Sequence, residues 1–197
     1  EEHAWVKAPR ILEDHYSLLD ALAFGGMAIT LLNHADRVKV ACLAQLVNVI
    51  APIFTEPRKG SYRQSIYWPF RDISVYGRGT VLTPVVTSDK KVTEKYGEVP
   101  AVIYATVLSE DEKTLTVFAL NTSKTEKANV NLNLMNFGST KMIFRTEMTG
   151  SDLSARNSLE TPDAVCNKDA PLVSGENGNF NITLNEVSWN VMRFSIE

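Results

Sequence analysis

The pattern of hydrophobic and polar positions divides the chain into a helical first part and a second part of short alternating segments. Residues 14–33 carry apolar side chains at helical spacing, in a stripe wide enough to predict burial on more than one side. Asp14 and Ser17 stand near its start as candidate N-caps. Residues 38–43 (VKVACL) then form a short apolar run, typical of a parallel strand buried on both faces. One such strand cannot make a sheet, so this part predicts a piece of a larger α/β structure.

A second helix is predicted over residues 69–76. Pro69 suits the first helical turn, and Gly77 or Gly79 can end the helix. The preceding residues 55–60 (TEPRKG) predict a polar loop.

Beyond residue 80 the helical period disappears and the pattern favours β-structure. Residues 101–108 and 114–120 flank a polar turn and predict a hairpin. Residues 150–178 are polar and predict a long loop. Further strands are expected at residues 130–134, 141–148, 180–184 and 189–196. Regular short strands with polar turns indicate an antiparallel sandwich.

Composition narrows the classes of function. The 197 residues are 44% hydrophobic and 22% charged with a net charge of −3, so no basic footprint for nucleic acid is present. The three histidines and two distant cysteines have no metal-ligand spacing, so no metal site is expected. Residues 21–32 fall short of the roughly 20 apolar residues that a membrane span needs. No leader-like segment precedes Trp5, but a sequence that starts at Glu1 leaves localisation open.

The acidic residues near the first helix raise the question of glycoside hydrolysis, which commonly uses two carboxylates. Glu13, Asp14 and Asp20 cluster at the helix start, where negative charge stabilises the positive end of the helix dipole. This structural role is enough to explain the three acidic residues without a catalytic function. Asp36 and Arg37 similarly predict a structural ion pair in the loop after the helix.

Gln45 is the candidate binding residue. It follows the predicted strand at the carboxyl end, where α/β barrels and open sheets place their sites. Its amide both donates and accepts hydrogen bonds, which matches a sugar hydroxyl. The alternative is that Gln45 satisfies a buried backbone group. Asn48 could share the binding role or fix the loop.

Several stretches of the sequence carry a family resemblance. They are residues 8–14, 20–22, 34–53, 63–70, 76–79 and 188–193. Together they closely resemble the C-terminal part of α-L-arabinofuranosidases of glycoside hydrolase family 51. The resemblance is specific through residue 79, whereas residues 89–186 share only the β pattern.

This resemblance implies the C-terminal segment of a (β/α)₈ TIM barrel followed by an antiparallel, jelly-roll-like β-sandwich. Residues 1–79 would supply the final helices and the last strand of an incomplete barrel, and residues 80–197 the sandwich. The two catalytic glutamates of such retaining enzymes lie in motifs that this chain lacks, so no catalytic residue is expected here and the chain alone should be inactive. Gln45 matches a family residue that hydrogen-bonds the arabinofuranose where cleavage occurs.

The implied function is removal of terminal α-L-arabinofuranosyl residues from arabinan, arabinoxylan or their oligosaccharides. No metal or organic cofactor is implied. The implied partners are these arabinose-containing glycans, the remainder of the barrel and further copies of the full-length enzyme. A cytoplasmic location is favoured. Two alternatives stay open: a related family 51 hydrolase acting on xylosides or β-glucans, and a non-catalytic β-sandwich that binds carbohydrate or mediates assembly. In the latter, Tyr67, Trp68 and Trp189 could stack on sugars rather than pack internally.

Overall fold

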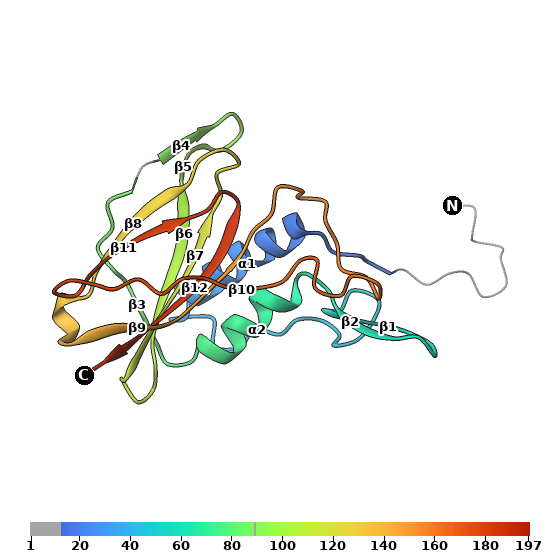
Figure 1. Ribbon diagram of the computed structural model, residues 1–197, viewed down its shortest axis with the longest axis horizontal. Helices are drawn as coiled ribbons and strands as arrows, with labels where there is room; N and C mark the ends of the chain where they lie inside the picture. The colour runs from blue at the N-terminus through green and yellow to red at the C-terminus, as the bar shows by residue number, and fades with distance from the viewer. Residues whose placement is uncertain (1–12, 89) are drawn as a thin grey trace.

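A computed structural model describes residues 13–88 and 90–197 (Figure 1). The first stretch of the family resemblance, residues 8–14, therefore lies mostly outside the described residues. The helical elements are α1 (Leu18–Asn33), α2 (Tyr67–Tyr76) and a short 3-10 turn at Met135–Phe137. The first strands are β1 (Ile53–Glu56), β2 (Gly60–Arg63), β3 (Thr80–Leu82), β4 (Lys90–Thr93), β5 (Gly97–Pro100) and β6 (Val102–Leu108). The remaining strands are β7 (Thr114–Asn121), β8 (Ala128–Asn133), β9 (Thr140–Met148), β10 (Lys168–Asp169), β11 (Asn179–Leu184) and β12 (Ser188–Ile196).

A six-stranded antiparallel sheet in the order β10-β9-β12-β7-β6-β3 is the centre of the structure. The predicted hairpin is confirmed, because β6 and β7 pair from Val102 opposite Asn121 to Leu108 opposite Leu115. The strands predicted near 141–148, 180–184 and 189–196 are confirmed as β9, β11 and β12. The antiparallel sandwich expected from the sequence is therefore the observed architecture of the second part of the chain.

The sheet is covered differently on its two faces. On one face Phe118 and Leu120 of β7 pack with α1 and α2, and on the other Leu115 and Val117 pack against the β8–β11 pair. Strict alternation along β7 thus serves two separate hydrophobic cores. Figure 1 shows α1 and α2 together on one side of the sheet and β8–β11 on the other.

The first predicted helix is present as α1 and begins at a capping box. The Ser17 hydroxyl accepts a hydrogen bond from the Asp20 backbone N–H, and the Asp20 carboxylate accepts one from the Ser17 N–H. Ser17 is therefore the N-cap, and the structural role expected of Asp20 is confirmed. Asp14 lies before the cap, so its prediction as a cap is wrong.

The expectation that α1 is buried on more than one side is not met. Its sheet-facing residues, such as Ala21 and Ile29, are fully buried, whereas Leu19, Met27 and Leu31 are 51%, 61% and 44% exposed. No described element covers this second apolar stripe.

The strand predicted over residues 38–43 is wrong for this structure, because these residues have no regular secondary structure. Val40 is 79% exposed. A strand buried on both faces needs hydrogen-bonded neighbours on either side, and no described strand lies beside this segment. The barrel portion of the expected fold is accordingly not formed by the described residues.

The helix predicted from Pro69 is confirmed as α2, which starts two residues earlier and has Gly77 as its C-cap. The predicted polar loop at 55–60 is the turn of a β1–β2 hairpin that the sequence pattern did not indicate. Residues 150–178 form the predicted long loop. Its one strand is the two-residue β10. This loop returns to α1, where Ala155 and Leu153 carbonyls accept hydrogen bonds from the first two helical N–H groups.

Candidate functional site

Gln45, the candidate binding residue, lies in the irregular segment that follows residues 38–43. Its side chain is exposed, and its backbone has a φ of 58°. Asn48 and Val49 are also left-handed, each with a φ of 61°. A positive φ is unusual for a β-branched residue such as Val49 and stores strain, which tends to cluster at functional segments.

Asn48 holds this segment against β1. Its amide donates to the Thr55 hydroxyl at 2.8 Å and accepts from the Thr55 backbone N–H at 2.7 Å, while the Asn48 N–H donates to the Ile53 carbonyl at 2.8 Å. The two bonds to Thr55 engage both ends of the amide. Of the two roles left open for Asn48, the structure shows that of fixing the loop.

Gln64 provides the second anchor of the segment and was missed by sequence reasoning. Its buried amide donates to the carbonyls of Asp14 and Ala51 at 3.0 and 2.9 Å, and accepts from the Tyr16 N–H at 3.0 Å. The Tyr16 hydroxyl donates to the Ile50 carbonyl at 2.9 Å. These hydrogen bonds connect residues 50–51, which follow the Gln45 segment in the chain, to residues 14–16 and to Gln64. In the sequence Gln64 stands between the polar residues Arg63 and Ser65, so the pattern gives no signal that its side chain is buried.

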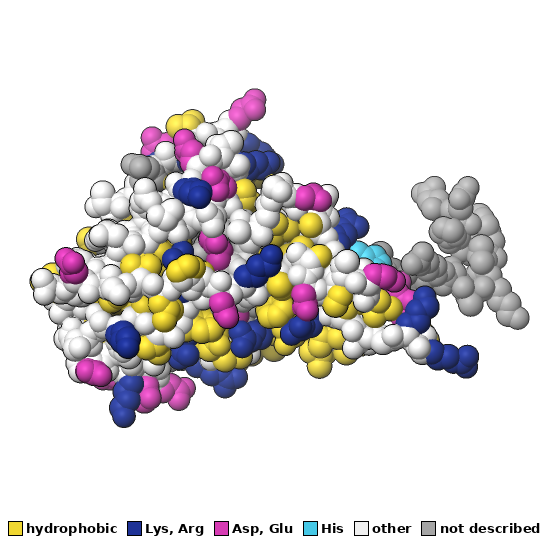
Figure 2. Space-filling model, viewed as in Figure 1, with side chains coloured by type: hydrophobic (Ala, Val, Ile, Leu, Met, Phe, Trp, Pro, Cys, Tyr) yellow, Lys and Arg dark blue, Asp and Glu magenta, His cyan; other side chains and the backbone are white. Residues whose placement is uncertain are grey.

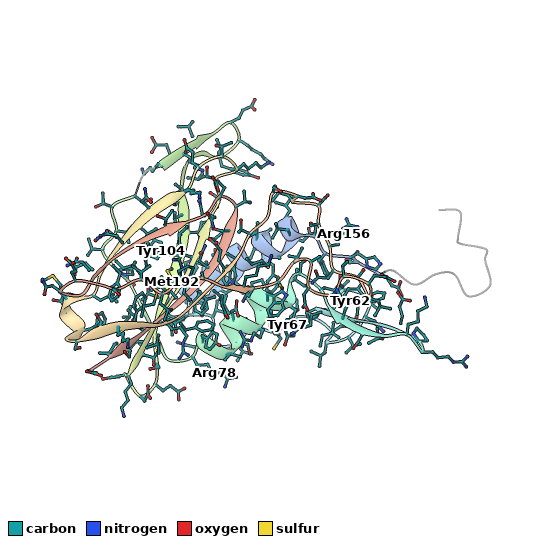
Figure 3. The ribbon with its side chains drawn as sticks, viewed as in Figure 1. Tyr62, Tyr67, Arg78, Tyr104, Arg156 and Met192 are labelled. Carbon is teal, nitrogen blue, oxygen red and sulfur yellow. The ribbon has the colours of Figure 1, made fainter. Side chains whose placement is uncertain are left out.

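An aromatic cluster lies beside the same anchor. Phe54 of β1 has its ring 5.0 Å from that of His15 and 5.3 Å from that of Tyr62, and the Tyr62 hydroxyl is 3.4 Å from His15 Nδ1. Burial raises the pKa of Tyr62, and the nearby carboxylate of Glu56 raises it further. Tyr62 therefore stays a neutral phenol that can donate or accept a hydrogen bond. Figure 3 places Tyr62 at the β1–β2 end of the molecule, away from Tyr104 and Met192 on the sheet.

The predicted ion pair between Asp36 and Arg37 is present at 3.9 Å, with both side chains largely exposed. Such an exposed pair contributes little to stability. Among the described residues no group of three or more histidine, cysteine, aspartate or glutamate side chains could hold a metal ion. In the same part of the chain, neither helix is long and apolar enough to cross a bilayer.

The three aromatic residues considered for sugar stacking differ in their surroundings. Trp189 is fully buried between the sheet and the helices, stacked on Phe118 with 5.9 Å between ring centroids. Trp68 is partly buried in the same core, and its indole N–H donates to the Val165 carbonyl at 3.1 Å. Internal packing, one of the two roles considered, is therefore what the structure shows for Trp189, whereas Tyr67 at the start of α2 keeps access to solvent.

The buried carboxylate of Asp72 joins α2 to the sandwich. It accepts hydrogen bonds from the Trp189 indole at 2.9 Å, the Asn167 amide at 2.7 Å and the Arg71 guanidinium at 3.0 Å. Burial raises the pKa of Asp72 above its ordinary value, and these three donors oppose that rise. The arrangement is a structural connection between the helices and the sheet.

Comparison with known proteins assigns the chain to a family. Residues 1–188 match the sequence model of the α-L-arabinofuranosidase C-terminal domain. The chain is 43% identical over 189 residues to an intracellular exo-α-(1→5)-L-arabinofuranosidase of Streptomyces lividans, and 41% identical to one of Bacillus subtilis. These alignments cover 96% of this chain but only 28% and 37% of the two relatives.

Solved structures agree with the sequence match. The structure of AbfB, a family 51 α-L-arabinofuranosidase from Bifidobacterium longum, superposes with a TM-score of 0.87 at 32% identity, covering 96% of this chain and 37% of that one. The thermostable family 51 enzyme from Thermotoga petrophila gives 0.79 at 26% identity, over 96% of this chain and 40% of that one. The chain therefore belongs to the family 51 α-L-arabinofuranosidases and corresponds to their C-terminal part, which confirms the resemblance seen in its motifs.

Proposed function

We propose that this chain is the C-terminal part of a retaining, exo-acting α-L-arabinofuranosidase whose catalytic glutamates lie upstream of it. Its substrates would be terminal α-L-arabinofuranosyl residues of arabinan, arabinoxylan or their oligosaccharides. The observation that carries this proposal is the 38–43% identity to four enzymes named intracellular exo-α-(1→5)-L-arabinofuranosidases, over nearly the whole chain. Their names also favour a cytoplasmic location.

Within this proposal, residues 1–79 complete a TIM barrel and residues 80–197 form the sandwich. Residues 38–43 would become the last barrel strand once neighbouring strands pair with it. The exposed stripe of Leu19, Met27 and Leu31 supports the proposal, because a barrel helix packs on both its strands and its neighbours. The remainder of the barrel is thus the first partner, and self-association of the complete enzyme is a second.

Gln45 is proposed to orient the arabinofuranose ring by hydrogen bonds to its hydroxyl groups. Its support is its position at the carboxyl end of the proposed strand, where barrel enzymes place their sites. Asn48 and Gln64 would hold the Gln45 segment in place through their hydrogen bonds to Thr55, Asp14 and Ala51. Such positioning contributes to lowering the barrier by fixing the reacting geometry.

The names of the relatives differ in the linkage that they give. A relative that is 40% identical, from Bifidobacterium longum, is named an exo-α-(1→6)-L-arabinofuranosidase. Relatives with similar sequence identity to this chain are thus named for different linkages. A xyloside or β-glucan substrate, or a purely binding role, remain the alternatives.

The decisive test is hydrolysis of an aryl α-L-arabinofuranoside by an enzyme that carries this chain at its C-terminus, beside the chain alone. We expect turnover by the first and none above background by the second. Turnover of an aryl β-xyloside in preference to the arabinoside would replace the proposed substrate. Retention of the chain alone on insoluble arabinoxylan would favour the binding module instead.

A further inference from the structure

A cavity of about 380 Å³ lies between the start of α2, strand β9 and the end of the long loop. Its lining includes the side chains of Tyr67, Arg71, Phe144, Thr146, Asn167 and Asp169. This volume is at the lower end of the range for small-molecule sites, about 300–1,000 Å³. Figure 3 places Tyr67 at the start of α2, on the side of the molecule that carries the long loop. On the same side, Figure 2 shows hydrophobic and charged side chains interspersed around α2.

Two polar atoms at this cavity are buried without a hydrogen-bond partner: Thr146 Oγ1 and Asn167 Oδ1. Thr146 is only 5% exposed. The Asn167 amide nitrogen is already used, because it donates to Asp72 at 2.7 Å, and this fixes the orientation of the amide. A buried polar atom without a hydrogen-bond partner destabilises the protein, so both atoms favour a ligand that supplies the missing hydrogen bonds.

The chemistry of the unpaired atoms selects the kind of ligand. Asn167 Oδ1 and the Asp169 carboxylate accept hydrogen bonds, so the ligand must offer donors. A fully ionised carboxylate or phosphate group offers none. The two guanidinium groups at the cavity are also engaged already: Arg71 contacts Asp72 at 3.0 Å and Arg63 contacts Asp163 at 3.1 Å. Together these contacts favour a neutral ligand over a phosphate or carboxylate.

The rest of the lining suits a sugar. A sugar hydroxyl is donor and acceptor at once, so it can give a hydrogen bond to Asn167 Oδ1 and accept one from Thr146. The C–H groups of a sugar ring can pack on the negative faces of Tyr67 and Phe144. Arg63 stacks over the Trp68 ring at 4.6 Å and stiffens this wall of the cavity.

We propose that this cavity between α2, β9 and the long loop is a binding site for a neutral, hydroxyl-rich sugar unit. The hydroxyl-rich class follows from the cavity itself. The narrower class, an arabinosyl unit of a polysaccharide, rests on the proposed function.

The test compares two variants of an enzyme that carries this chain. The first, Thr146→Val with Asp169→Ala, removes two polar groups from the cavity wall. The matched control is Thr140→Val, because Thr140 also has a buried unpartnered hydroxyl on β9 but does not line the cavity. Six residues along a strand correspond to about 20 Å.

Equilibrium dialysis with L-arabinose counts the sugar bound per chain. We expect the double variant to lose one class of sites, with at least about a tenfold rise in its dissociation constant, and the control to keep it. A parallel rise in KM on linear arabinan, relative to the control, is expected for the double variant. Equal binding by the two variants overturns the proposal, as does saturable binding of inorganic phosphate that displaces the sugar.

The outcomes also separate this site from the proposed function. Absence of turnover on the aryl arabinoside by the control and the unsubstituted enzyme would contradict the proposed function, while L-arabinose binding at the cavity would still be measured. Thermal unfolding of each variant checks the fold. Asp169→Ala alone, at an exposed position, repeats the binding test if the double variant unfolds.

Discussion

The indole N–H of Trp189 on β12 donates a 2.9 Å hydrogen bond to the carboxylate of Asp72 on α2, and both side chains are fully buried. The two residues are 117 positions apart in the chain. Their contact fastens the helical part to the sandwich at the centre of the shared core. A buried carboxylate is stabilised only while its donors remain, so this connection should respond sharply to substitution.

Trp189→Phe should lower the free energy of unfolding by roughly 2–4 kcal/mol. The change removes one donor to a buried carboxylate and leaves space beside Phe118. Urea denaturation followed by circular dichroism measures the loss. Val191→Ala, at a fully buried position on the same strand, is the control for packing alone. A smaller loss for Trp189→Phe than for this control would contradict a role for the hydrogen bond.

The pKa of Asp72 predicts a pH dependence of stability. Burial raises this pKa in the folded protein above its ordinary value of 3.8. Between pH 3.8 and the folded pKa, the folded state therefore binds more protons than the unfolded state. The contribution of Asp72 to the free energy of unfolding should therefore be greatest at acid pH. It should fall as pH rises through the folded pKa and then level off.

Asp72→Asn cannot titrate and isolates this effect. The free energy of unfolding of the unsubstituted protein minus that of Asp72→Asn should decrease as pH rises from 3.8 through the folded pKa of Asp72. Urea midpoints at several pH values give the difference. A difference that grows with pH would mean that the three donors outweigh burial.

Gly25 and Gly26 on α1 should respond oppositely to alanine. A Cβ on Gly25 would lie 2.7 and 2.9 Å from atoms of the Trp189 ring, which is fixed by its hydrogen bond. One on Gly26 would meet the ends of two flexible side chains, Leu120 Cδ2 at 3.1 Å and Ile103 Cδ1 at 4.0 Å. Gly25→Ala should cost about 1–3 kcal/mol through overpacking. Gly26→Ala should be neutral or stabilising by up to about 1 kcal/mol, because alanine favours the helix. Thermal unfolding of the two variants, measured side by side, decides the order.

Gln64→Glu tests how the hydrogen bonds of Gln64 stabilise the segment that follows Gln45. The glutamine amide donates to two carbonyl oxygens, which an ionised carboxylate of the same shape would repel. Burial and these carbonyls should raise the pKa of the new glutamate in the folded state, so the variant should be less stable at pH 8 than at pH 5, relative to the unsubstituted protein. The control is Gln64→Met, which removes the same hydrogen bonds without adding a charge. Equal pH profiles for the two variants would contradict the argument.

Much of the sandwich could be predicted from sequence because alternation reports directly on the two faces of a strand. β7 shows this well: Leu115 and Val117 face one core, and Phe118 and Leu120 the other. The segment 38–43 shows the limit of such reasoning. Its apolar pattern states what environment the residues need, but the described chain provides no neighbouring strand, and so Val40 is exposed.

The site was predictable only in part for a related reason. Gln45 was suggested by its place after a strand pattern, and its surroundings depend on elements that the described residues do not form. Gln64 and Asp72 act through contacts with residues far away in the chain, such as Tyr16 and Trp189. A single sequence does not show such pairs. The capping box at Ser17 and Asp20, in contrast, is local and was visible as residue types at a helix start.

Gln45 itself can be separated into its amide and its backbone by two substitutions. In an enzyme that carries this chain, Gln45→Ala removes the amide and keeps a Cβ in the left-handed conformation, where φ is 58°, whereas Gln45→Gly removes the amide and relieves that strain. If the amide binds the arabinose ring, both should lower kcat/KM on an aryl α-L-arabinofuranoside by roughly 5- to 150-fold, the equivalent of about 1–3 kcal/mol. Asn48→Ala should instead act on stability as well, since Asn48 holds the segment through Thr55. Unchanged kinetics in Gln45→Gly would remove Gln45 from the site, because glycine adopts this backbone conformation most readily and only the amide is missing.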